Sequence, residues 1–229
     1  MQENSKTIIL KMVTLESLEH RIDTLCKSYN LPNDEHCLRF HAMAVKAGFK
    51  HPIVVRVPSD YYDRTLEERV EYINTHASSP VPADFDVNCL CKSLVLKNSK
   101  WTPQGEYSDE LCPQNSKYYF ILIQYNRIFI SQRLFIYVRS LKENSPQKYY
   151  NFRSASEEEA VELTGFAHNG MTPLGSKVSI PLVIDEEMLK LPYICFGAGH
   201  EDVKIIVPTS EFMEVYKPYV CAYSKERDE

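Results

Sequence analysis

The chain contains 229 residues, of which 44% are apolar and 25% are charged, and this composition is typical of a globular protein. It excludes disordered, collagen-like and repeat proteins, and it favours one domain that buries its core without disulfide bonds or a structural metal. The formal net charge of −5 argues, as an average, against nucleic-acid binding. Residues 92–153 depart from that average, because they carry ten basic and four acidic side chains. We interpret them as a phosphate-binding face, with charges scattered over solvated surfaces as the alternative.

The cysteines and the apolar runs of the sequence indicate the cellular compartment. The seven cysteines are odd in number and have no regular spacing, and residues 1–11 lack the apolar core of a signal peptide. No apolar run approaches the roughly 20 residues that a membrane helix needs. The sequence therefore predicts reduced thiols, a cytoplasmic protein and no membrane partner.

The first half of the chain mixes helical and strand patterns. Apolar residues at helical spacing predict a surface helix that begins after Thr14, and residues 34–48 are ambiguous. The alternation of Val87, Cys89 and Cys91 with their neighbours predicts a strand. This strand covers residues 87–96. The other predicted elements are a strand at 52–57 and a helix capped by Asp63 with Leu66, Val70 and Ile73 on one face.

The second half starts with a polar segment, 98–117, which we interpret as an inserted loop. Residues 118–125 form the most apolar strand candidate and are expected at the centre of a sheet. Residues 131–142 fit a strand and a helix equally well. The remaining predicted elements are a helix at 156–164 with a Ser156–Glu159 capping box and a stop at Gly165, a strand at 177–184, a one-turn helix capped by Asp185, strands at 193–196 and 203–207, and a helix from Thr209 or Ser210 to Tyr216. This order lacks a regular βαβ alternation and predicts the α+β class or a mixed sheet.

Glycine placement is the most informative feature for function. Five of the seven glycines fall between residues 165 and 199. In the loop 165–175, Gly170 and Gly175 permit positive φ and Pro173 adds stiffness, so backbone amides can face a ligand. Residues 196–200 form a second such turn. Neither segment matches a known phosphate-binding motif, and two structural turns remain the alternative.

Among polar side chains, Lys92 is unusual because it interrupts an apolar strand. It is either a solvated edge residue or a charge directed into a cleft that binds carboxylate or phosphate. His168 and His200 differ from the other five histidines because they lie in the glycine-rich turns. For each of them, the sequence supports a functional role and an ordinary structural role equally.

Metal binding and thiol catalysis find little support. Cys89 and Cys91 lack the second cysteine pair of a structural zinc site, and His36, Cys37 and His41 have poor ligand spacing, so we expect no metal. A cysteine hydrolase would need Cys91 or Cys195 as its nucleophile and His168 or His200 as its base. No nucleophile-elbow motif supports it.

Three motifs, in this order, resemble the YbaK and prolyl-tRNA-synthetase-associated domain family of aminoacyl-tRNA deacylases. The first is the strand lysine in Lys92–Val95 (KSLV), and the second is the helix end Glu162–Gly165 (ELTG) followed by Gly170–Gly175 (GMTPLG). The third is the turn Gly197–Gly199 before a late strand. The resemblance covers residues 50–217.

The resemblance implies a YbaK-like fold, a compact, barrel-like mixed β-sheet with surrounding helices, and it favours a helix at 131–142. It implies hydrolysis of the ester of mischarged tRNA, without cofactor, metal or covalent nucleophile. Attack would come from water or from the substrate's own groups, and oriented backbone donors fit such chemistry. The implied catalytic residues are Lys92 and His200, and the implied substrate-binding residues are Gly170, Thr172, Pro173, Gly175, Gly197 and Gly199.

The remaining predictions concern organisation and partners. We expect an N-terminal helical extension at 1–50 packed on the core, the deacylase domain at 50–217 and a C-terminal tail at 218–229. The expected partners are mischarged tRNA, held by Arg133, Arg139 and Lys142, and an aminoacyl-tRNA synthetase; DNA is not expected. The alternatives are a non-catalytic tRNA-binding or synthetase-associated module on the same fold, and a hydrolase of another small ester or amide.

Overall fold

The computed structural model describes residues 34–104, 106–107, 109–142 and 146–227, and five isolated positions before residue 34 (20, 21, 23, 24 and 27). The helix predicted after Thr14 depends on Leu15, Leu18, Ile22 and Leu25, which lie outside these residues. Within the described part, no helix is long and apolar enough to cross a membrane.

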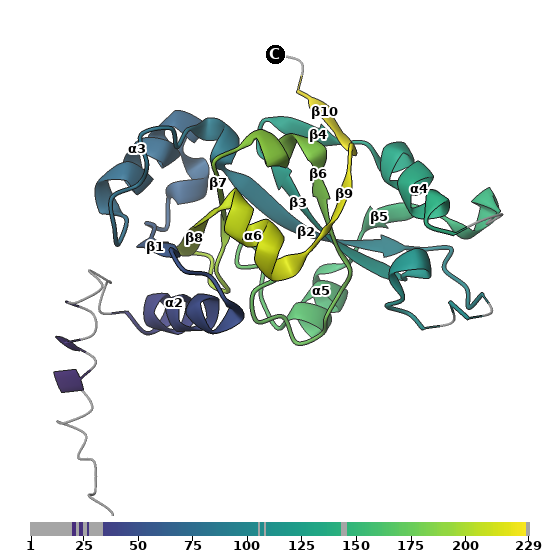
Figure 1. Cartoon of the computed structure of the whole chain (residues 1–229), viewed down its shortest axis with the longest axis horizontal. Helices are drawn as coiled ribbons and strands as arrows, with labels where there is room; N and C mark the ends of the chain where they lie inside the picture. Colours follow the sequence, from purple (N-terminus) through teal and green to yellow (C-terminus); the bar gives the residue numbers. More distant parts are fainter. Residues whose placement is uncertain are drawn as a thin grey trace, which may run out of the picture.

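A five-stranded mixed sheet forms the centre of the molecule (Figure 1). Its strand order is β5-β2-β3-β6-β9, and β3 lies in the middle with all seven residues buried, as the sequence predicts. The strands β2 and β3, and β2 and β5, pair antiparallel, whereas β3 with β6 and β6 with β9 pair parallel. The bounds are β2 Cys91–Asn98, β3 Tyr118–Gln124, β5 Phe152–Ser154, β6 Leu182–Asp185 and β9 Tyr219–Cys221. The predicted α+β class with a mixed sheet is confirmed.

The described residues form two smaller sheets as well. An antiparallel sheet has the order β1-β8-β7, and a two-stranded sheet joins β10 to β4. The bounds are β1 Ile53–Arg56, β4 Arg127–Phe129, β7 Tyr193–Gly197, β8 Val203–Pro208 and β10 Ser224–Glu226. Because the strands of the described residues divide into three sheets, they do not form a closed barrel, and the expected barrel-like closure is corrected.

Within the described residues, five α-helices surround the sheets: α2 Glu35–Ala47, α3 Leu66–His76, α4 Ser131–Ser140, α5 Glu157–Thr164 and α6 Thr209–Tyr216. Residues 34–48, which the sequence left ambiguous, form α2, with Asp34 accepting a hydrogen bond from the Cys37 amide and Gly48 ending the helix at φ 111°. The segment 131–142, which fitted a strand and a helix equally well, forms the helix α4, because Leu134, Phe135 and Val138 bury one apolar side of it. The α5 capping box and the left-handed Gly165 are confirmed.

Some element boundaries differ from the prediction. Thr65, not Asp63, caps α3, because Thr65 and Glu68 exchange side-chain to backbone hydrogen bonds. Residues Val87–Cys89 form a 3₁₀ turn, so the strand begins only at Cys91. The strand predicted at 177–184 begins at Leu182.

The two faces of the central sheet build separate cores. On β2, Cys91 and Val95 pack in a cluster with apolar residues of α2, α5 and α6. Leu94 and Leu96 pack on the opposite side, in a cluster that includes the buried residues of α4. A third cluster lies between the β1-β8-β7 sheet and α3 and contains Ile73 and Ile206. This alternation decides which side chains of β2 reach each face.

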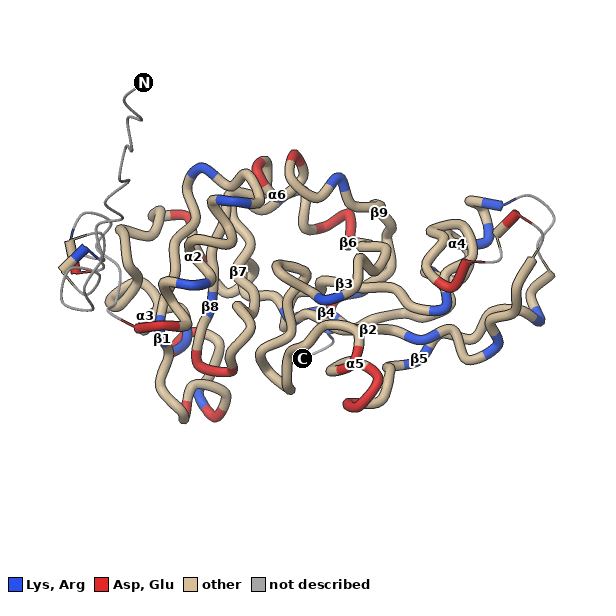
Figure 2. Tube along the Cα trace, turned by 90° about the horizontal axis from the view of Figure 1, so that it is seen from below, with Lys and Arg blue, Asp and Glu red and all other residues tan. Residues whose placement is uncertain are grey.

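Helix α2 and the C-terminal strands β9 and β10 belong to these layers. In α2, Cys37, Phe40 and Ala44 are buried in the first of these cores. Within the segment 218–229, β9 is the edge strand of the central sheet and β10 pairs with β4. Figure 2 shows Lys and Arg along β2 and β5, beside the acidic α5.

Candidate functional site

An incompletely paired edge of β2 borders a cavity. The strand pairs with β3 along Cys91–Lys97, but with β5 only along Leu96–Asn98. Beyond that point, the Ala155 amide still donates a 2.9 Å hydrogen bond to the Val95 carbonyl. A cavity of about 440 Å³ lies along residues 91–95, a volume typical of small-molecule sites. Its other walls come from Tyr61, Tyr62, Leu90, Tyr125, Ser154, Ala155, Ser156, Glu157, Ala160, His168, Asn169, Met171, Cys195, Gly197 and Lys204.

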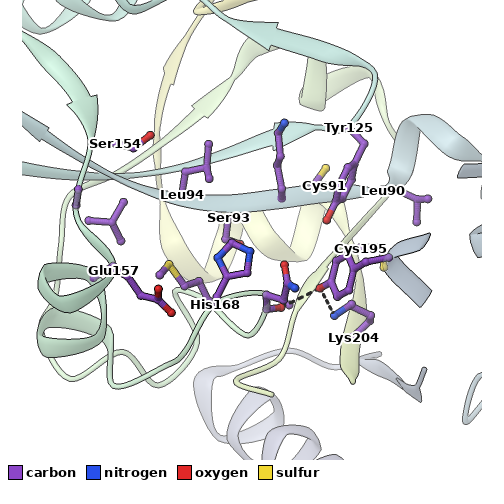
Figure 3. A pocket seen from close by; sticks show the side chains of 18 of the residues that line it. Leu90, Cys91, Ser93, Leu94, Tyr125, Ser154, Glu157, His168, Cys195 and Lys204 are labelled. Carbon is purple, nitrogen blue, oxygen red and sulfur yellow. Dashed lines mark hydrogen bonds between the residues drawn. The ribbon is translucent and has the colours of Figure 1, made fainter. Parts of the chain in front are cut away.

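Ser93 supplies the polar part of this edge. The backbone groups of alternate residues in a strand point to the same side, so Ser93 shares the orientation of Val95 and directs its amide and carbonyl away from β3. Its Oγ is buried and has no hydrogen-bond partner among the described residues. Figure 3 shows Ser93 and His168 on facing sides of the cavity, with Leu94 pointing to the opposite side of β2. A buried hydroxyl without a partner is a natural contact for a polar ligand.

A buried lysine lies at the other end of the cavity. Alternation along β8 places Lys204 on the same side as Ile206, where it faces the 3₁₀ turn Tyr61–Asp63. Its Nζ donates hydrogen bonds to the Tyr62 hydroxyl (2.7 Å) and to the Glu201 carbonyl (2.6 Å). The Tyr62 hydroxyl in turn donates to the Asn169 carbonyl (3.0 Å). This chain of hydrogen bonds connects β8 to the loop that carries His168.

The ammonium group of Lys204 is a concentrated charge. Only 4% of the residue is exposed, and burial lowers its pKa from 10.5 to about 8. The ring centroid of Tyr62 lies 4.8 Å from its Nζ, and it makes no ion pair within the described part of the chain. A cation that is held by neutral acceptors keeps its field available for an anion.

The two cavity cysteines are protonated thiols. Burial raises the pKa of Cys91 well above its ordinary range and raises that of Cys195 to about 12. Because the thiolate is the nucleophile, neither cysteine is activated in this environment. These pKa directions argue against the cysteine-hydrolase alternative.

The two glycine-rich turns pack against each other. The Gly199 amide donates to the Gly170 carbonyl over 2.8 Å, and a Cβ on Gly170 would lie 3.1 Å from the Gly199 carbonyl carbon. The left-handed residue at this point is Asn169, at φ 62°, so the expectation that Gly170 adopts positive φ is corrected. A Cβ on Gly197 would lie 2.7 Å from the Met171 carbonyl oxygen. Close backbone approach is therefore the reason for glycine at both positions.

Only part of the predicted set lines the cavity. Lys92 and Gly197 do, and so does His168. By strand alternation the Lys92 side chain lies on the Leu94 side of β2, and its Nζ is 5.7 Å from the Tyr125 ring centroid. The predicted residues outside the lining are Gly170, Thr172, Pro173, Gly175, Gly199 and His200.

Three of the residues outside the lining make local structural contacts. Thr172 is fully buried and accepts a hydrogen bond from the Leu174 amide, and Gly175 adopts φ 75° near Met43. His200 accepts from the Asp202 amide through Nδ1, and its ring lies 4.4 Å from that of His36. The structure thus brings His168, rather than His200, to the cavity.

The predicted tRNA-binding residues lie elsewhere. Arg133, Arg139 and Lys142 belong to α4 and its C-terminal end, and α4 covers the sheet face that carries Leu94. Arg133 Nη1 donates to the Ser224 carbonyl, and Lys142 Nζ donates to Gln104 Oε1 at 2.7 Å. Arg139 is exposed.

No group of three or more potential ligands among His, Cys, Asp and Glu comes together in the described ranges, so no residue set there is suited to holding a metal. The residues that sequence reasoning missed are Ser93, Tyr62 and Lys204. Lys204 carries the same signal as Lys92, a lysine inside an apolar strand (VKIIV). Tyr62 has no such signal, because its role depends on distant residues.

The fold and cavity define an α+β protein with a small-molecule pocket at the edge of a mixed sheet. Residues 143–215 match the model of the aminoacyl-tRNA editing domain family, which confirms the resemblance over that segment. No curated protein matches the sequence.

Solved structures share the fold. One is described as a candidate trans-editing enzyme for prolyl tRNA synthetase; it is 22% identical, with a TM-score of 0.60, and the match covers 85% of this chain and 99% of that chain. Another comes from computational epitope-backbone grafting onto scaffold proteins, at 18% identity and TM-score 0.60 with the same coverage. A third, of a hypothetical protein, is 17% identical with a TM-score of 0.56, covering 81% and 98% of the two chains.

Proposed function

We propose that this protein is an aminoacyl-tRNA deacylase, which hydrolyses the ester between a wrong amino acid and the terminal adenosine of tRNA. The editing-domain match over residues 143–215 supports this reaction class. The shared fold with a structure described as a candidate trans-editing enzyme supports it further. We also propose that it acts in the cytoplasm beside an aminoacyl-tRNA synthetase, whose errors supply the substrate.

The pocket chemistry fits ester hydrolysis by water. Water adds to the ester carbonyl carbon, the carbonyl oxygen takes up negative charge, and collapse releases the amino acid and the free ribose hydroxyl of tRNA. The Lys204 ammonium is suited to stabilise the developing oxyanion, and Tyr62 keeps that ammonium in place. His168, across the cavity from Ser93, is the proposed acceptor for the water proton, which it then returns to the departing ribose oxygen.

One observation carries the proposal: the cavity holds a buried ammonium group, Lys204, whose hydrogen-bond partners are neutral, next to thiols that are not nucleophilic. Such a site favours electrostatic stabilisation of an anion over covalent catalysis. The ester of aminoacyl-tRNA is activated enough for this to suffice.

The direct test is a panel of mischarged tRNAs, incubated with the protein while loss of each amino acid is measured. We expect one or a few amino acids to be released at least tenfold faster than without protein, and correctly charged tRNAs to be spared. Lys190→Met, a change at a surface lysine that pairs with Glu187, is the matched control for Lys204→Met. If Lys204→Met releases the amino acid as fast as the wild-type protein does, the role proposed for Lys204 is contradicted.

A non-catalytic tRNA-binding or synthetase-associated module is the second candidate. It is favoured by the separation of the two motif residues, because Lys92 lies on the Leu94 side of β2 and His200 packs against His36. Under this alternative, the protein binds aminoacylated tRNA but releases no amino acid from any member of the panel.

A further inference from the structure

A second hollow adjoins the cavity. It has a volume of about 610 Å³ and is more open to solvent. It is lined by Arg64, Thr65, Leu66, Arg69, Lys92, Tyr125, Asn126, Glu226 and Arg227. Lys92 and Tyr125 line both spaces, so the two spaces adjoin at these residues. The walls come from the start of α3, the β3–β4 turn and the end of β10.

The charge of this hollow is strongly positive. Its lining includes four cations and one carboxylate, Glu226, whose side chain is 88% exposed and pairs at 3.8 Å with Arg127 outside the lining. Arg64 pairs with Asp60 at 3.1 Å. Lys92, Arg69 and Arg227 make no ion pair within the part of the chain that the structure describes. An anion bound here would meet three uncompensated charges.

Two of these cations repel each other. Burial, and then the charge of Arg227, lower the pKa of Lys92. Like charges held close together destabilise a fold unless a counter-charge joins them. The Arg227 amide donates to the Asn126 carbonyl (3.2 Å), and the pairing of β10 with β4 fixes the chain just before it. The fold thus keeps Arg227 near Lys92.

Arg69 provides a fixed charge beside the hollow. The residue is 8% exposed; its Nε donates to the Arg64 carbonyl (3.1 Å) and its Nη2 to the Tyr62 carbonyl (2.6 Å). Its Nη1 is buried and has no hydrogen-bond partner among the described residues. The Tyr125 ring centroid is 5.1 Å from its guanidinium carbon. A buried guanidinium without a carboxylate partner indicates a site that an anion completes.

We propose that this hollow binds a backbone phosphate of the single-stranded 3′ end of the substrate, while the adjoining cavity receives the aminoacyl group. This inference rests on the proposed function. Phosphate is the anion that a nucleotide chain carries next to its terminal ribose, and arginine side chains bind it through paired N–H donors. The shared wall of Lys92 and Tyr125 places the phosphate site directly beside the ester site.

The test compares substrates with and without phosphate. Wild-type protein and the variants Arg227→Glu and Arg64→Glu are assayed on aminoacyl-adenosine, which has no phosphate, and on an aminoacylated CCA trinucleotide. We expect each variant to lower kcat/KM on the trinucleotide at least tenfold and to change it less than twofold on aminoacyl-adenosine. The control Lys190→Glu, which makes the same charge change at a surface pair with Glu187, should affect neither substrate. Melting temperatures show whether each variant is folded.

Equal losses on both substrates, or no loss on either, would overturn the phosphate site. If wild-type protein hydrolyses neither substrate, the deacylase proposal fails, but the hollow is still tested by binding of a fluorescent CCA trinucleotide. Binding that weakens with salt and at least tenfold in Arg227→Glu supports the site. Binding that Arg227→Glu leaves unchanged overturns it.

Discussion

Lys204 and Tyr62 form a hydrogen-bonded pair in the cavity wall, with 2.7 Å between the Nζ and the hydroxyl oxygen. The pair joins two segments more than a hundred residues apart in sequence, and the Asn169 carbonyl accepts the hydroxyl proton of Tyr62. A network of this kind holds the ammonium group in one position without neutralising its charge. Its two members are therefore the first targets for mutagenesis.

The first prediction concerns the charge of Lys204. Lys204→Met keeps the length and apolar character of the stem but removes the ammonium group, so we expect kcat/KM for deacylation to fall at least tenfold, which corresponds to about 1.4 kcal/mol of transition-state stabilisation. Tyr62→Phe, which removes only the hydroxyl that positions the ammonium group, should cause a smaller loss. The rates are measured on a mischarged tRNA that the wild-type protein hydrolyses. A larger loss in Tyr62→Phe would assign the main role to tyrosine.

The second prediction uses the titration of the same lysine. Its pKa is about 8 in the folded protein, against 10.5 as its ordinary value. Below pH 8 the lysine is charged in both states, so the fold bears the whole cost of burying the charge. Between pH 8 and pH 10.5 the unfolded chain binds more protons than the folded protein, so this cost decreases as the pH rises. The two pKa values correspond to a burial cost of about 3 kcal/mol for the charged lysine.

Lys204→Met removes this cost of burial. The unfolding free energy of the variant minus that of the wild type should therefore be largest near pH 7 and should decrease as pH rises through 8 to 10. Urea unfolding at pH 7, 8.5 and 9.5 measures it. A difference that stays constant over this range would mean that Lys204 titrates normally in the folded protein.

Much of the fold follows from local sequence signals. The all-apolar run of β3 and the capping box with Gly165 of α5 each fix an element through neighbouring residues. Local sequence could not decide between strand and helix at 131–142, because the aromatic and β-branched residues of α4 fit a strand as well. Packing on the sheet selects the helix. The strands β4, β5, β9 and β10 were not predicted, since each has only three residues and depends on its partner strand.

The site was less predictable for a related reason. The lysine and glycine patterns led to Lys92 and Gly197, which do line the cavity. They did not reveal Lys204, because its position in the cavity depends on a hydrogen bond to Tyr62, 142 residues away. His200 and His168 carry the same local signal, and only the packing of the two glycine turns brings His168 to the cavity.

The third prediction tests the backbone contact at Gly197. A methyl group there would lie 2.7 Å from the Met171 carbonyl oxygen and 3.4 Å from that of Asn169. Gly197→Ala must therefore displace the loop that carries the cavity wall, and we expect a loss of about 1–3 kcal/mol in unfolding free energy together with reduced deacylation. Gly48→Ala is the matched control, because its Cβ meets only Val215 Cγ2 at 3.6 Å, although φ is 111°. The control should lose stability through strain but keep its activity.

The last prediction returns to the basic middle of the chain. Arg133, Arg139 and Lys142 lie on or just after α4, away from the cavity lining. If they contact tRNA phosphates, changing all three to Glu should weaken tRNA binding and flatten the dependence of log Kd on log salt by about two to three, while aminoacyl-adenosine is hydrolysed normally. Because Arg133 also bonds to the Ser224 carbonyl, Arg139→Glu alone serves as the variant that leaves the α4–β10 contact intact, and it should flatten the slope by about one. Equal losses on tRNA and aminoacyl-adenosine would mean that α4 supports the fold or the pocket, and unchanged binding would return these charges to an ordinary solvated surface.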